Sequence, residues 1–547
     1  MYMFIKMEKR KGDIKNLWPV LVIIGFGLIC FCFFQLLYSY HFYFKGQNQL
    51  FLMSWSYVSM LFDKPAWAAC LVGEFLTQFY YYDVAGATIL TISLTVLFWL
   101  TYQALGSLRF KNQKFNRWAV LIAALLITMR EVSCHLYYGY MLSSTFALMG
   151  GLLMFLILHR LMECRWPWAL IVVLSGTLLC YWLFGYGVWA FLLLSVFAVW
   201  KVTVPVVVTF VFCLLPFMRS YYNLTFTGLC QYPDVESFHA PDFLKETDFH
   251  MMHSYETSDW DDVVKTAEAD PLLNILTEKG SAQKKLTQEA QVSSTIRRFL
   301  YNLVQAQKGN LPDVLMEYYP NYLGTFTSMI GTNLPMLMFM NLHEFYYAIG
   351  DIPRAERGAF MSCVSVPGNR NAYTIKRLAE CALVRNDQKA VEKFLGLLRQ
   401  TIPYKDWAES VPNDKRYKQK AQFINQQDSI SPSEDSYNIM TQLLRSNPKN
   451  EVALDYLLCS QLLKKDIDNF KRDYDLYCTE SPRIRKLYQE ALCIWLMKQK
   501  ATEEEWQKYI KDKQVRSRME EYIREGAKPR FADTYWFYFD IFNIDTH

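Results

Sequence analysis

The first 220 residues of this 547-residue chain are short of charge. Five stretches contain no Asp, Glu, Lys or Arg, although these four residue types make up 20% of the whole chain. Such long charge-free stretches exclude an ordinary soluble domain and are typical of helices that cross a membrane, where about 20 apolar residues span the hydrocarbon core. The charge-free stretches are residues 17–40, 84–108, 136–158, 166–200 and 202–218.

The sequence also lacks the motifs of common soluble enzymes, since it has no P-loop, no G-x-S-x-G, no H-E-x-x-H and no dinucleotide fingerprint. The net charge of +5 comes without a Lys/Arg-rich stripe, so we expect no nucleic-acid partner. None of the thirteen cysteines forms a C-x-x-C pair, and we expect buried free thiols, although a bridge between Cys363 and Cys381 is an alternative. His250 and His253 offer too few convergent ligands for zinc, so we expect neither a metal nor a cofactor.

We predict seven membrane spans from the charge-free stretches. Residues 166–200 are too many for one span, and Gly185-Tyr186-Gly187 near their middle supplies a turn between two spans. Each span should be a helix, because backbone polar groups in lipid must bond within their own segment. A basic segment precedes the first span as in a signal peptide, but the apolar run is too long and no A-x-A site follows, so we expect no cleavage. The predicted spans are residues 17–40, 84–106, 118–135, 138–158, 166–183, 185–200 and 202–219.

Positive charge is concentrated between alternate spans. If the N-terminus is cytoplasmic, the short inner segments carry twelve Lys or Arg residues and the outer segments carry four. Tyrosine-rich clusters follow span one, precede span two and separate spans three and four, all on the proposed outer side, and such rings prefer the headgroup level. The positive-inside rule therefore predicts a cytoplasmic N-terminus and, after seven crossings, an extracytoplasmic segment from residue 220 onward.

The first outer segment, residues 41–83, alternates apolar and aromatic pieces with scattered charges, which favours two amphipathic helices lying in the membrane interface. A long outer loop with interfacial helices after span one resembles the C-type-fold glycosyltransferases that use lipid-linked sugars. The resemblance implies a catalytic acid directly after span one, but this chain reads Tyr43-Phe44-Lys45-Gly46-Gln47 there. Asp63 and Glu74, farther along, are the alternative acids. The simpler interpretation is that both are solvated charges on interfacial helices.

Ionisable residues also lie near the outer end of span three. Arg130 and Glu131 follow twelve apolar residues, and His135 comes four positions after Glu131, on the same helix face. Ionisable groups at membrane depth are candidates for function, so this Glu–His pair is a candidate to move a proton or contact a headgroup. The alternative is a shallow placement in which long side chains reach the interface.

The C-terminal part reads as helix after helix. Residues 220–257 are predicted to be a linker with short helices, and residues 258–547 a helical-repeat domain similar to tetratricopeptide repeats. Small residues let paired helices approach, Gly or Asn turns the corner and Pro ends the second helix. A one-off helical bundle is the alternative, and residues 405–435 look like an irregular insertion. The repeat-like positions are Gly309-Asn310-Leu311, Tyr346, Gly350-Asp351, Ala355, Pro367, Asn386-Asp387, Ala390, Pro403, Asn447-Pro448 and Ser481-Pro482.

The chain resembles an uncharacterised bacterial family of multi-span proteins with a helical-repeat tail. The resemblance implies an inner-membrane protein with periplasmic repeats, and it brings no activity and no catalytic residues. It rests on residues 49–51, 73–80, 355–360, 376–380 and 401–408, which read Gln-Leu-Phe, Gly-Glu-Phe-Leu-Thr-Gln-Phe-Tyr, Ala-Glu-Arg-Gly-Ala-Phe, Lys-Arg-Leu-Ala-Glu and Thr-Ile-Pro-Tyr-Lys-Asp-Trp-Ala.

These observations favour an all-α protein in which a membrane domain, residues 1–219, anchors an extracytoplasmic scaffold that binds a protein or glycan partner. The alternative is a glycosyltransferase-like enzyme at the outer leaflet, whose candidate catalytic residues would be Asp63, Glu74, Glu131 and His135. A transporter is a third hypothesis, but the spans show few polar groups near the midplane and no repeated half. Membrane lipid is the one partner that every hypothesis requires.

Overall fold

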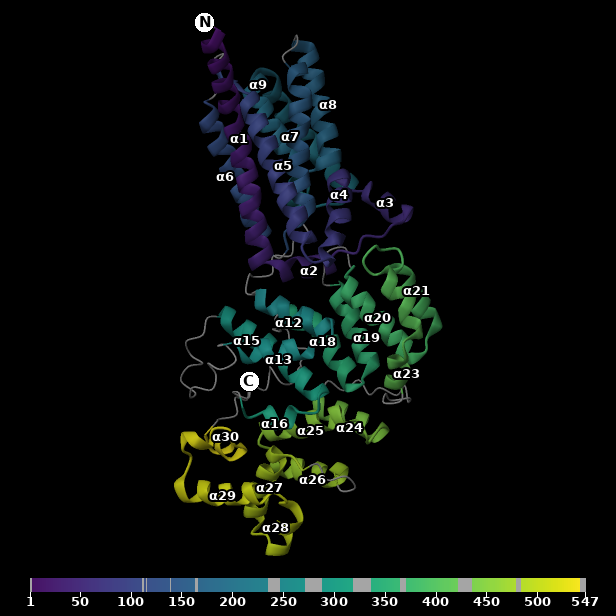
Figure 1. The fold of residues 1–547 in the computed structure, drawn as a ribbon. Coiled ribbons are helices and arrows are strands. Elements are labelled where there is room, and N and C mark those ends of the chain that lie inside the picture. The colour runs from purple at the N-terminus through teal and green to yellow at the C-terminus, as the bar shows by residue number, and fades with distance from the viewer. Residues whose placement is uncertain are drawn as a thin grey trace. The chain divides into compact units, whose positions relative to one another are not determined.

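The computed structural model divides into two compact units (Figure 1). The membrane unit comprises residues 1–240 together with the segments 366–373 and 395–409. The tail unit comprises residues 241–365, 374–394 and 410–547. The residues that the structure describes are 2–110, 113–114, 116–137, 139–162, 166–234, 246–270, 288–317, 336–364, 370–421, 435–478 and 484–541.

Six helices among the described residues are long and apolar enough to cross a membrane. Hydroxyls inside them donate to the carbonyl one turn back, as Thr101 Oγ1 does to Leu97 O at 2.8 Å, so that these polar groups need no water. The fold is all-α, as the sequence predicts, apart from the two-residue strands β1 (Arg109–Phe110) and β2 (Gln113–Lys114). The six candidates are Trp18–Leu37 within α1 (Tyr2–Leu37), α5 (Ala85–Ser107), α6 (Arg117–His135), α7 (Leu142–Met162), α8 (Trp166–Phe184) and the run Gly187–Tyr222, which joins α9 (Gly187–Thr209), η2 (Phe210–Leu214) and α10 (Leu215–Tyr222).

The last of these candidates doubles back on itself. Val199 has non-helical dihedrals (φ −142°, ψ 59°) in the middle of α9. The Trp189 and Phe210 rings lie 5.8 Å apart, whereas in a straight helix 21 residues would separate them by about 31 Å. The run Gly187–Tyr222 is therefore two antiparallel arms, which correspond to the predicted spans 185–200 and 202–219.

The chain consequently leaves the bundle at the end opposite to Trp18. Successive helices alternate in direction (Figure 1), which places the α8–α9 turn at the end that also holds residues 38–84 and 136–141. Tyr186 N in that turn donates to Tyr232 O at 2.8 Å, so the segment after α10 returns to the same end. We call this the exit end and the other the N-terminal end. Counting the reversal at Val199, the chain traverses the bundle seven times.

The segment between α1 and α5 is helical and partly packed on the bundle. A Cβ added to Gly73 would lie 2.5 Å from Ser143 Cα, so α4 rests directly on the backbone of α7. Ala69 of α4 packs with Ala147 of α7 in the same way, whereas Trp55 of α3 is 75% exposed. That these helices lie in the membrane interface stays a prediction. The segment contains α2 (Ser39–Gln47), α3 (Trp55–Leu61), α4 (Trp67–Thr77) and η1 (Gln78–Tyr81).

After the membrane helices the chain forms shorter helices. Residues 405–421, predicted to belong to an irregular insertion, form three short helices, and Pro367 and Ser481-Pro482 lie outside the described residues. The helices are α11 (Phe226–Gln231) in the membrane unit and then α12 (Glu246–Glu256), α13 (Trp260–Glu268), α15 (Gln288–Gln307), α16 (Leu311–Val314), α18 (Met336–Ile349), α19 (Ile352–Val364), α20 (Ala372–Arg385), α21 (Gln388–Leu398), α22 (Lys405–Ser410), η7 (Val411–Asn413), α23 (Lys415–Ala421), α24 (Ser436–Ser446), α25 (Glu451–Leu463), α26 (Ile467–Cys478), α27 (Lys486–Gln499), α28 (Glu503–Tyr509), α29 (Lys513–Glu525), η8 (Pro529–Phe531) and α30 (Tyr535–Ile541).

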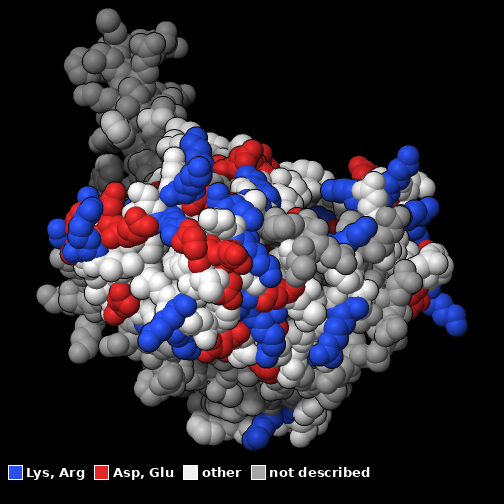
Figure 2. Space-filling view, turned by 90° about the horizontal axis from the view of Figure 1, so that it is seen from below, with Lys and Arg blue, Asp and Glu red and all other residues white. Residues whose placement is uncertain are grey.

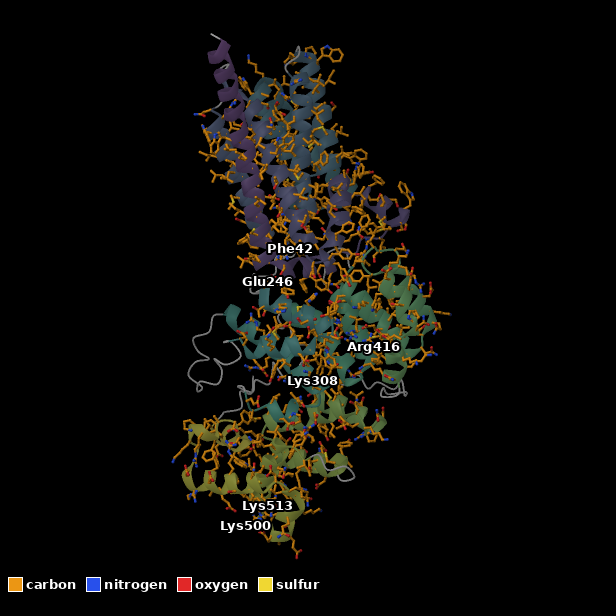
Figure 3. All side chains as sticks on the ribbon, in the orientation of Figure 1. Phe42, Glu246, Lys308, Arg416, Lys500 and Lys513 are labelled. Atoms are coloured by element: carbon orange, nitrogen blue, oxygen red, sulfur yellow. The ribbon has the colours of Figure 1, made fainter. Side chains whose placement is uncertain are left out.

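One turn recurs between helices of the tail unit. At each occurrence a single residue with positive φ ends the first helix, and the next amide donates to the carbonyl five residues back, which is the Schellman arrangement. The second helix then starts at once, and where Asp follows the positive-φ residue its carboxylate accepts from the amide three positions on, as Asp351 Oδ1 does from Arg354 N at 3.2 Å. The turns are centred on Ser258, Gly309, Gly350, Asn386, Lys465 and Lys500, and Lys500 is labelled in Figure 3.

Candidate functional site

The four residues singled out by the sequence lie on two separate elements of the membrane unit. Asp63, between α3 and α4, is exposed, and Glu74, on α4, is half-buried. Glu131 and His135 lie on the last turns of α6 and are 0% and 3% exposed. The structure thus pairs Glu131 with His135 and places Asp63 and Glu74 on the segment before α5.

Glu74 connects the two helices of that segment. Its carboxylate accepts a hydrogen bond from the Tyr57 hydroxyl of α3. Burial, and after it the charge of Glu74, raises the pKa of Tyr57, so that the phenol remains a donor. The Arg370 guanidinium, in segment 366–373 of the same unit, lies 4.6 Å from the Tyr57 ring centroid, a cation–π distance. These contacts favour a structural role for Glu74.

Glu131 is the carboxylate with the most unusual surroundings. Its Oε1 accepts hydrogen bonds from the Tyr140 hydroxyl (2.6 Å) and from Thr145 Oγ1 of α7 (2.8 Å). Its Oε2 is buried and has no hydrogen bond from any described residue, and the nearest cation is Arg130, with Nη1 3.7 Å away. Two donors on one oxygen and none on the other leave the carboxylate half satisfied.

Thr145 joins Glu131 to His135. The hydroxyl of Thr145 has one hydrogen, and because it donates that hydrogen to Glu131, His135 Nε2 must donate to Thr145 Oγ1 across their 2.6 Å contact. The imidazole is therefore protonated on Nε2. The arrangement Glu131–Thr145–His135 is a continuous hydrogen-bonded chain between two helices.

A buried lysine fixes the other side of this cluster. Lys45 of α2 is 4% exposed, and its Nζ donates to His135 O (3.1 Å) and to Tyr140 O (3.0 Å). These carbonyls follow the end of α6, where a cation is favoured by the helix dipole. Burial, followed by the charge of Lys45, lowers the pKa of His41 on the same helix well below its usual value, so His41 is neutral.

Two phenols close the cluster on the side of the α8–α9 turn. The Tyr186 hydroxyl donates to Ser144 O at 2.6 Å and lies 3.4 Å from the Tyr140 hydroxyl. Burial, and after it the charge of Glu131, raises the pKa of Tyr186 well above its usual value. Tyr140 is shifted in the same direction by burial and by its neighbours Tyr186 and Glu131. Both phenols therefore remain neutral hydrogen-bond donors.

Chemically, the cluster combines an acid, an imidazole, an amine and two phenols at the exit end. The i, i+4 spacing of Glu131 and His135 predicted their common face, but four partners were missed: Lys45, Tyr140, Thr145 and Tyr186. Tyr140 belongs to the tyrosine-rich cluster between spans three and four, and Lys45 lies in the stretch directly after span one where the glycosyltransferase resemblance implies an acid. One feature of the sequence could have identified Lys45 as a partner of this cluster. It is a charged residue that follows two aromatic residues close to the end of a predicted span.

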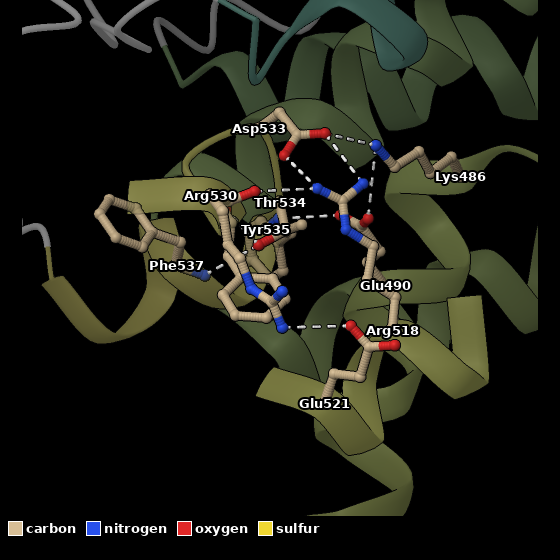
Figure 4. A network of polar contacts seen from close by, with 10 residues as sticks. Lys486, Glu490, Arg518, Glu521, Arg530, Asp533, Thr534, Tyr535 and Phe537 are labelled. Atoms are coloured by element: carbon tan, nitrogen blue, oxygen red, sulfur yellow. Dashed lines mark hydrogen bonds and ion pairs between the residues drawn. The ribbon is translucent and has the colours of Figure 1, made fainter. Parts of the chain in front are cut away.

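The tail unit also contains buried charged residues that bind partners on other helices. Arg297 of α15 binds Asp248 of α12 through Nε (2.6 Å) and also binds Asp270 through Nη1, and all three are nearly inaccessible. Glu490 of α27 accepts from Tyr535 N at 2.8 Å within a network of charged residues (Figure 4). Burial raises the pKa of Glu490 to about 7. Both arrangements hold helices together inside the tail unit.

Among the described residues, no three His, Cys, Asp or Glu side chains converge in a way that could hold a metal ion. His250 contacts Asp262, with Nε2 2.8 Å from Oδ2. Cys363 and Cys381 are both free thiols.

One family model matches residues 14–541, and its description is "Family of unknown function (DUF6057)". No curated protein and no solved structure matches the chain.

Proposed function

Because the chain belongs to the DUF6057 family, whose function is unknown, we propose a function from its own geometry: a multi-pass membrane anchor that holds a helical-repeat binding surface outside the cytoplasm. The observation that carries the proposal is the recurring turn of the tail unit, which joins one helix pair after another. Pairs of this kind cannot bury their apolar faces alone, so neighbours stack into an array whose surface binds partners. The array is similar to tetratricopeptide repeats.

The orientation in this proposal rests on charge and tryptophan. The segments at the N-terminal end of the bundle carry twelve Lys or Arg residues against three Asp or Glu, whereas the exit end carries four against five. An excess of basic residues marks the cytoplasmic side. Six described tryptophans have more than half of their surface exposed, and Trp55 of α3 is the one that lies at the exit end. The other five border the N-terminal end, as expected for a membrane interface: Trp18, Trp118, Trp166, Trp168 and Trp200.

The partner in this proposal is a protein or a glycan. Figure 2 shows a face on which Lys and Arg are interspersed with Asp and Glu. Charged residues of the tail unit also pair with one another, as Arg516 and Glu503 do with Nη1 and Oε1 2.6 Å apart. A surface of mixed sign favours recognition by shape and local hydrogen bonds over the uniform basic field that nucleic acid requires.

Sidedness tests this proposal most directly. We expect an impermeant maleimide to label a Lys513→Cys variant in intact spheroplasts, because Lys513 is exposed in the tail unit (Figure 3). Lys201→Cys, beside the reversal at Val199, should be labelled only after lysis. The unsubstituted chain, with its native thiols, is the control for background. Labelling of Lys201→Cys in spheroplasts together with protection of Lys513→Cys would overturn the orientation and the role of the tail.

The second candidate is a glycosyltransferase-like enzyme of the bacterial inner membrane that uses a lipid-linked sugar at the outer leaflet. The observation that favours it is the buried carboxylate of Glu131, held by hydroxyl donors at the exit end of α6. This reaction class needs an acid close to the headgroup plane. A Glu131→Gln variant that keeps its fold and membrane insertion but loses a glycan product in cells would favour the enzyme, and an unchanged glycan profile would favour the scaffold.

A further inference from the structure

Arg130 and Glu131 are neighbours in sequence with opposite environments. The Arg130 side chain is 71% exposed and that of Glu131 is 0% exposed, and their closest charged atoms, Nη1 and Oε2, are 3.7 Å apart. At this distance and angle the pair makes an ion contact without a hydrogen bond. The guanidinium therefore covers the carboxylate from the outside and keeps its donors available for another acceptor.

Glu131 Oε2 is the oxygen of this carboxylate that has no hydrogen-bond donor among the described residues. The other oxygen, Oε1, already has two donors, from Tyr140 and Thr145. A buried carboxylate oxygen without a donor costs free energy, and such a group in a folded protein calls for a specific explanation. The explanation that we favour for a buried oxygen beside the exposed Arg130 side chain is a ligand that supplies the missing donor.

The position of the pair indicates where that ligand comes from. Arg130 and Glu131 lie about one turn before His135, the last residue of α6 and of its candidate span. Tyr137, just beyond, is 54% exposed, and exposed tyrosines mark the headgroup level of a membrane protein. A phosphate at that level is within reach of a guanidinium on the last turns of the helix.

We propose that Arg130 and Glu131 form a binding site for an anionic phospholipid whose headgroup carries a free hydroxyl, with the phosphate on Arg130 and the hydroxyl donating to Glu131 Oε2. Arg130 accounts for the negative charge of the lipid, because a planar guanidinium can donate two parallel hydrogen bonds to two oxygens of one phosphate. Glu131 accounts for the hydroxyl of the lipid, because its free oxygen, Oε2, can accept a hydrogen bond. A ligand with only one of these two features would leave the other residue unsatisfied.

Other occupants fit this pair less well. A metal cation is disfavoured by the guanidinium and by the single free carboxylate oxygen, since metal sites need several convergent ligands. A zwitterionic choline headgroup has no hydroxyl or N–H donor for Oε2. This inference rests on the membrane placement of the bundle in the proposed function, and it is independent of what the tail binds.

Two lipids of equal charge, one with and one without a free hydroxyl, test the contribution of the hydroxyl separately from that of the negative charge. Phosphatidylglycerol and phosphatidylethanol carry the same charge, but the second lacks the free hydroxyl. For the full chain in nanodiscs of mixed lipid, we expect native mass spectrometry to show phosphatidylglycerol retained about tenfold more than phosphatidylethanol, which is the worth of one hydrogen bond to a charged group. Equal retention of the two lipids would refute the hydroxyl part of the proposal.

Variants assign the selectivity to the two residues. Arg130→Gln, an exposed substitution that should not affect folding, is expected to lower retention of both anionic lipids about tenfold relative to phosphatidylcholine. Glu131→Gln should remove the preference for the hydroxyl and leave the preference for negative charge. Arg219→Gln, an exposed arginine of α10 near the exit end, is the control and should change neither. An Arg130→Gln variant that behaves as the Arg219→Gln variant does would overturn the proposal, whatever the sidedness experiment shows.

Discussion

The two units bury charged side chains in different ways. In the tail unit the buried Arg297 meets two opposite charges, Asp248 and Asp270. In the membrane unit Glu131 accepts from Tyr140 and Thr145, and Lys45 donates to backbone carbonyls. In these hydrogen bonds the partners of Glu131 and Lys45 are neutral dipoles.

This difference predicts how much stability is lost when one partner of a buried charge is removed. An ion pair inside the tail unit depends on both partners, because either charge left alone is costly to bury. A charge that binds hydroxyls or carbonyls depends on several weaker hydrogen bonds, each of which is lost at lower cost. Removing a buried cation should therefore have a larger effect in the tail unit than in the membrane unit.

The largest effect is expected at Arg297. An Arg297→Met variant removes the buried cation that Asp248 and Asp270 share, which should lower the free energy of unfolding by about 3–5 kcal/mol. Pulse proteolysis of the full-length protein in urea measures this loss for the tail unit. The control is Arg516→Met, whose pair with Glu503 is largely exposed and should matter by less than about 1 kcal/mol. Equal losses of unfolding free energy for the two substitutions would show that burial does not determine how much these ion pairs stabilise the protein.

A pH-dependent effect is expected at Glu490. Burial raises the pKa of its carboxyl from 4.5 to about 7 in the folded protein. The folded state then holds a proton that the unfolded state releases, so the stability this group contributes is present below pH 4.5 and is lost as the pH rises to about 7. The full change in the free energy of unfolding is about 3 kcal/mol.

The segment that should respond is the one that Glu490 holds. Its Oε2 accepts from Tyr535 N and its backbone oxygen accepts from Trp536 Nε1, so α30 is tied to α27 (Figure 4). Hydrogen exchange at the Tyr535 amide should therefore quicken between pH 5 and 7, beyond the intrinsic rate. Glu490→Gln should abolish this extra dependence, and an unchanged profile in that variant would assign the dependence to Asp533 or its cationic partners.

A smaller effect is expected at Lys45 in the membrane unit. Lys45→Met removes the donor to His135 O and Tyr140 O but keeps the length of the side chain. Two carbonyls then lose one bond each, which should destabilise the membrane unit by about 1–3 kcal/mol, below the effect at Arg297. Thermal unfolding in detergent measures it, with Lys201→Met at the exposed reversal as the control. A loss larger than that of Arg297→Met would reverse the comparison between the units.

Much of the membrane unit could be predicted from sequence, because a segment that crosses lipid must be apolar and helical. Charge-free runs gave the helices, and Gly185 and Gly187 indicated the turn between α8 and the first arm of α9. The reversal near Lys201 was also predicted, although Val199 to Lys201 contains no glycine or proline, because the charge of Lys201 separates two charge-free runs. The dihedrals of Val199 make the turn, and no local signal in the sequence announces them.

The candidate site could be predicted only within one helix. Glu131 and His135 were paired by their spacing, which fixes a common helix face. Their link, Thr145, is on α7 and Lys45 is on α2, so both depend on how helices pack, which a sequence pattern does not contain. Asp63 and Glu74 were weighed because of their place after span one, and the structure gives Glu74 a phenol partner and leaves Asp63 exposed.

The smallest expected effect concerns the turns that sequence analysis missed. Gly309, Gly350 and Asn386 were recognised because Gly and Asn tolerate positive φ, but Lys465 (φ 57°) and Lys500 (φ 52°) occupy the same conformation. Lysine is strained there, so Lys500→Gly should raise the free energy of unfolding by about 0.5–1 kcal/mol, whereas Gly350→Ala should lower it by a similar amount. Urea denaturation followed by pulse proteolysis measures both changes. Destabilisation by Lys500→Gly would mean that the side chain of Lys500 contributes more than its backbone strain costs, and the turn at Lys500 would then be maintained differently from the turn at Gly350.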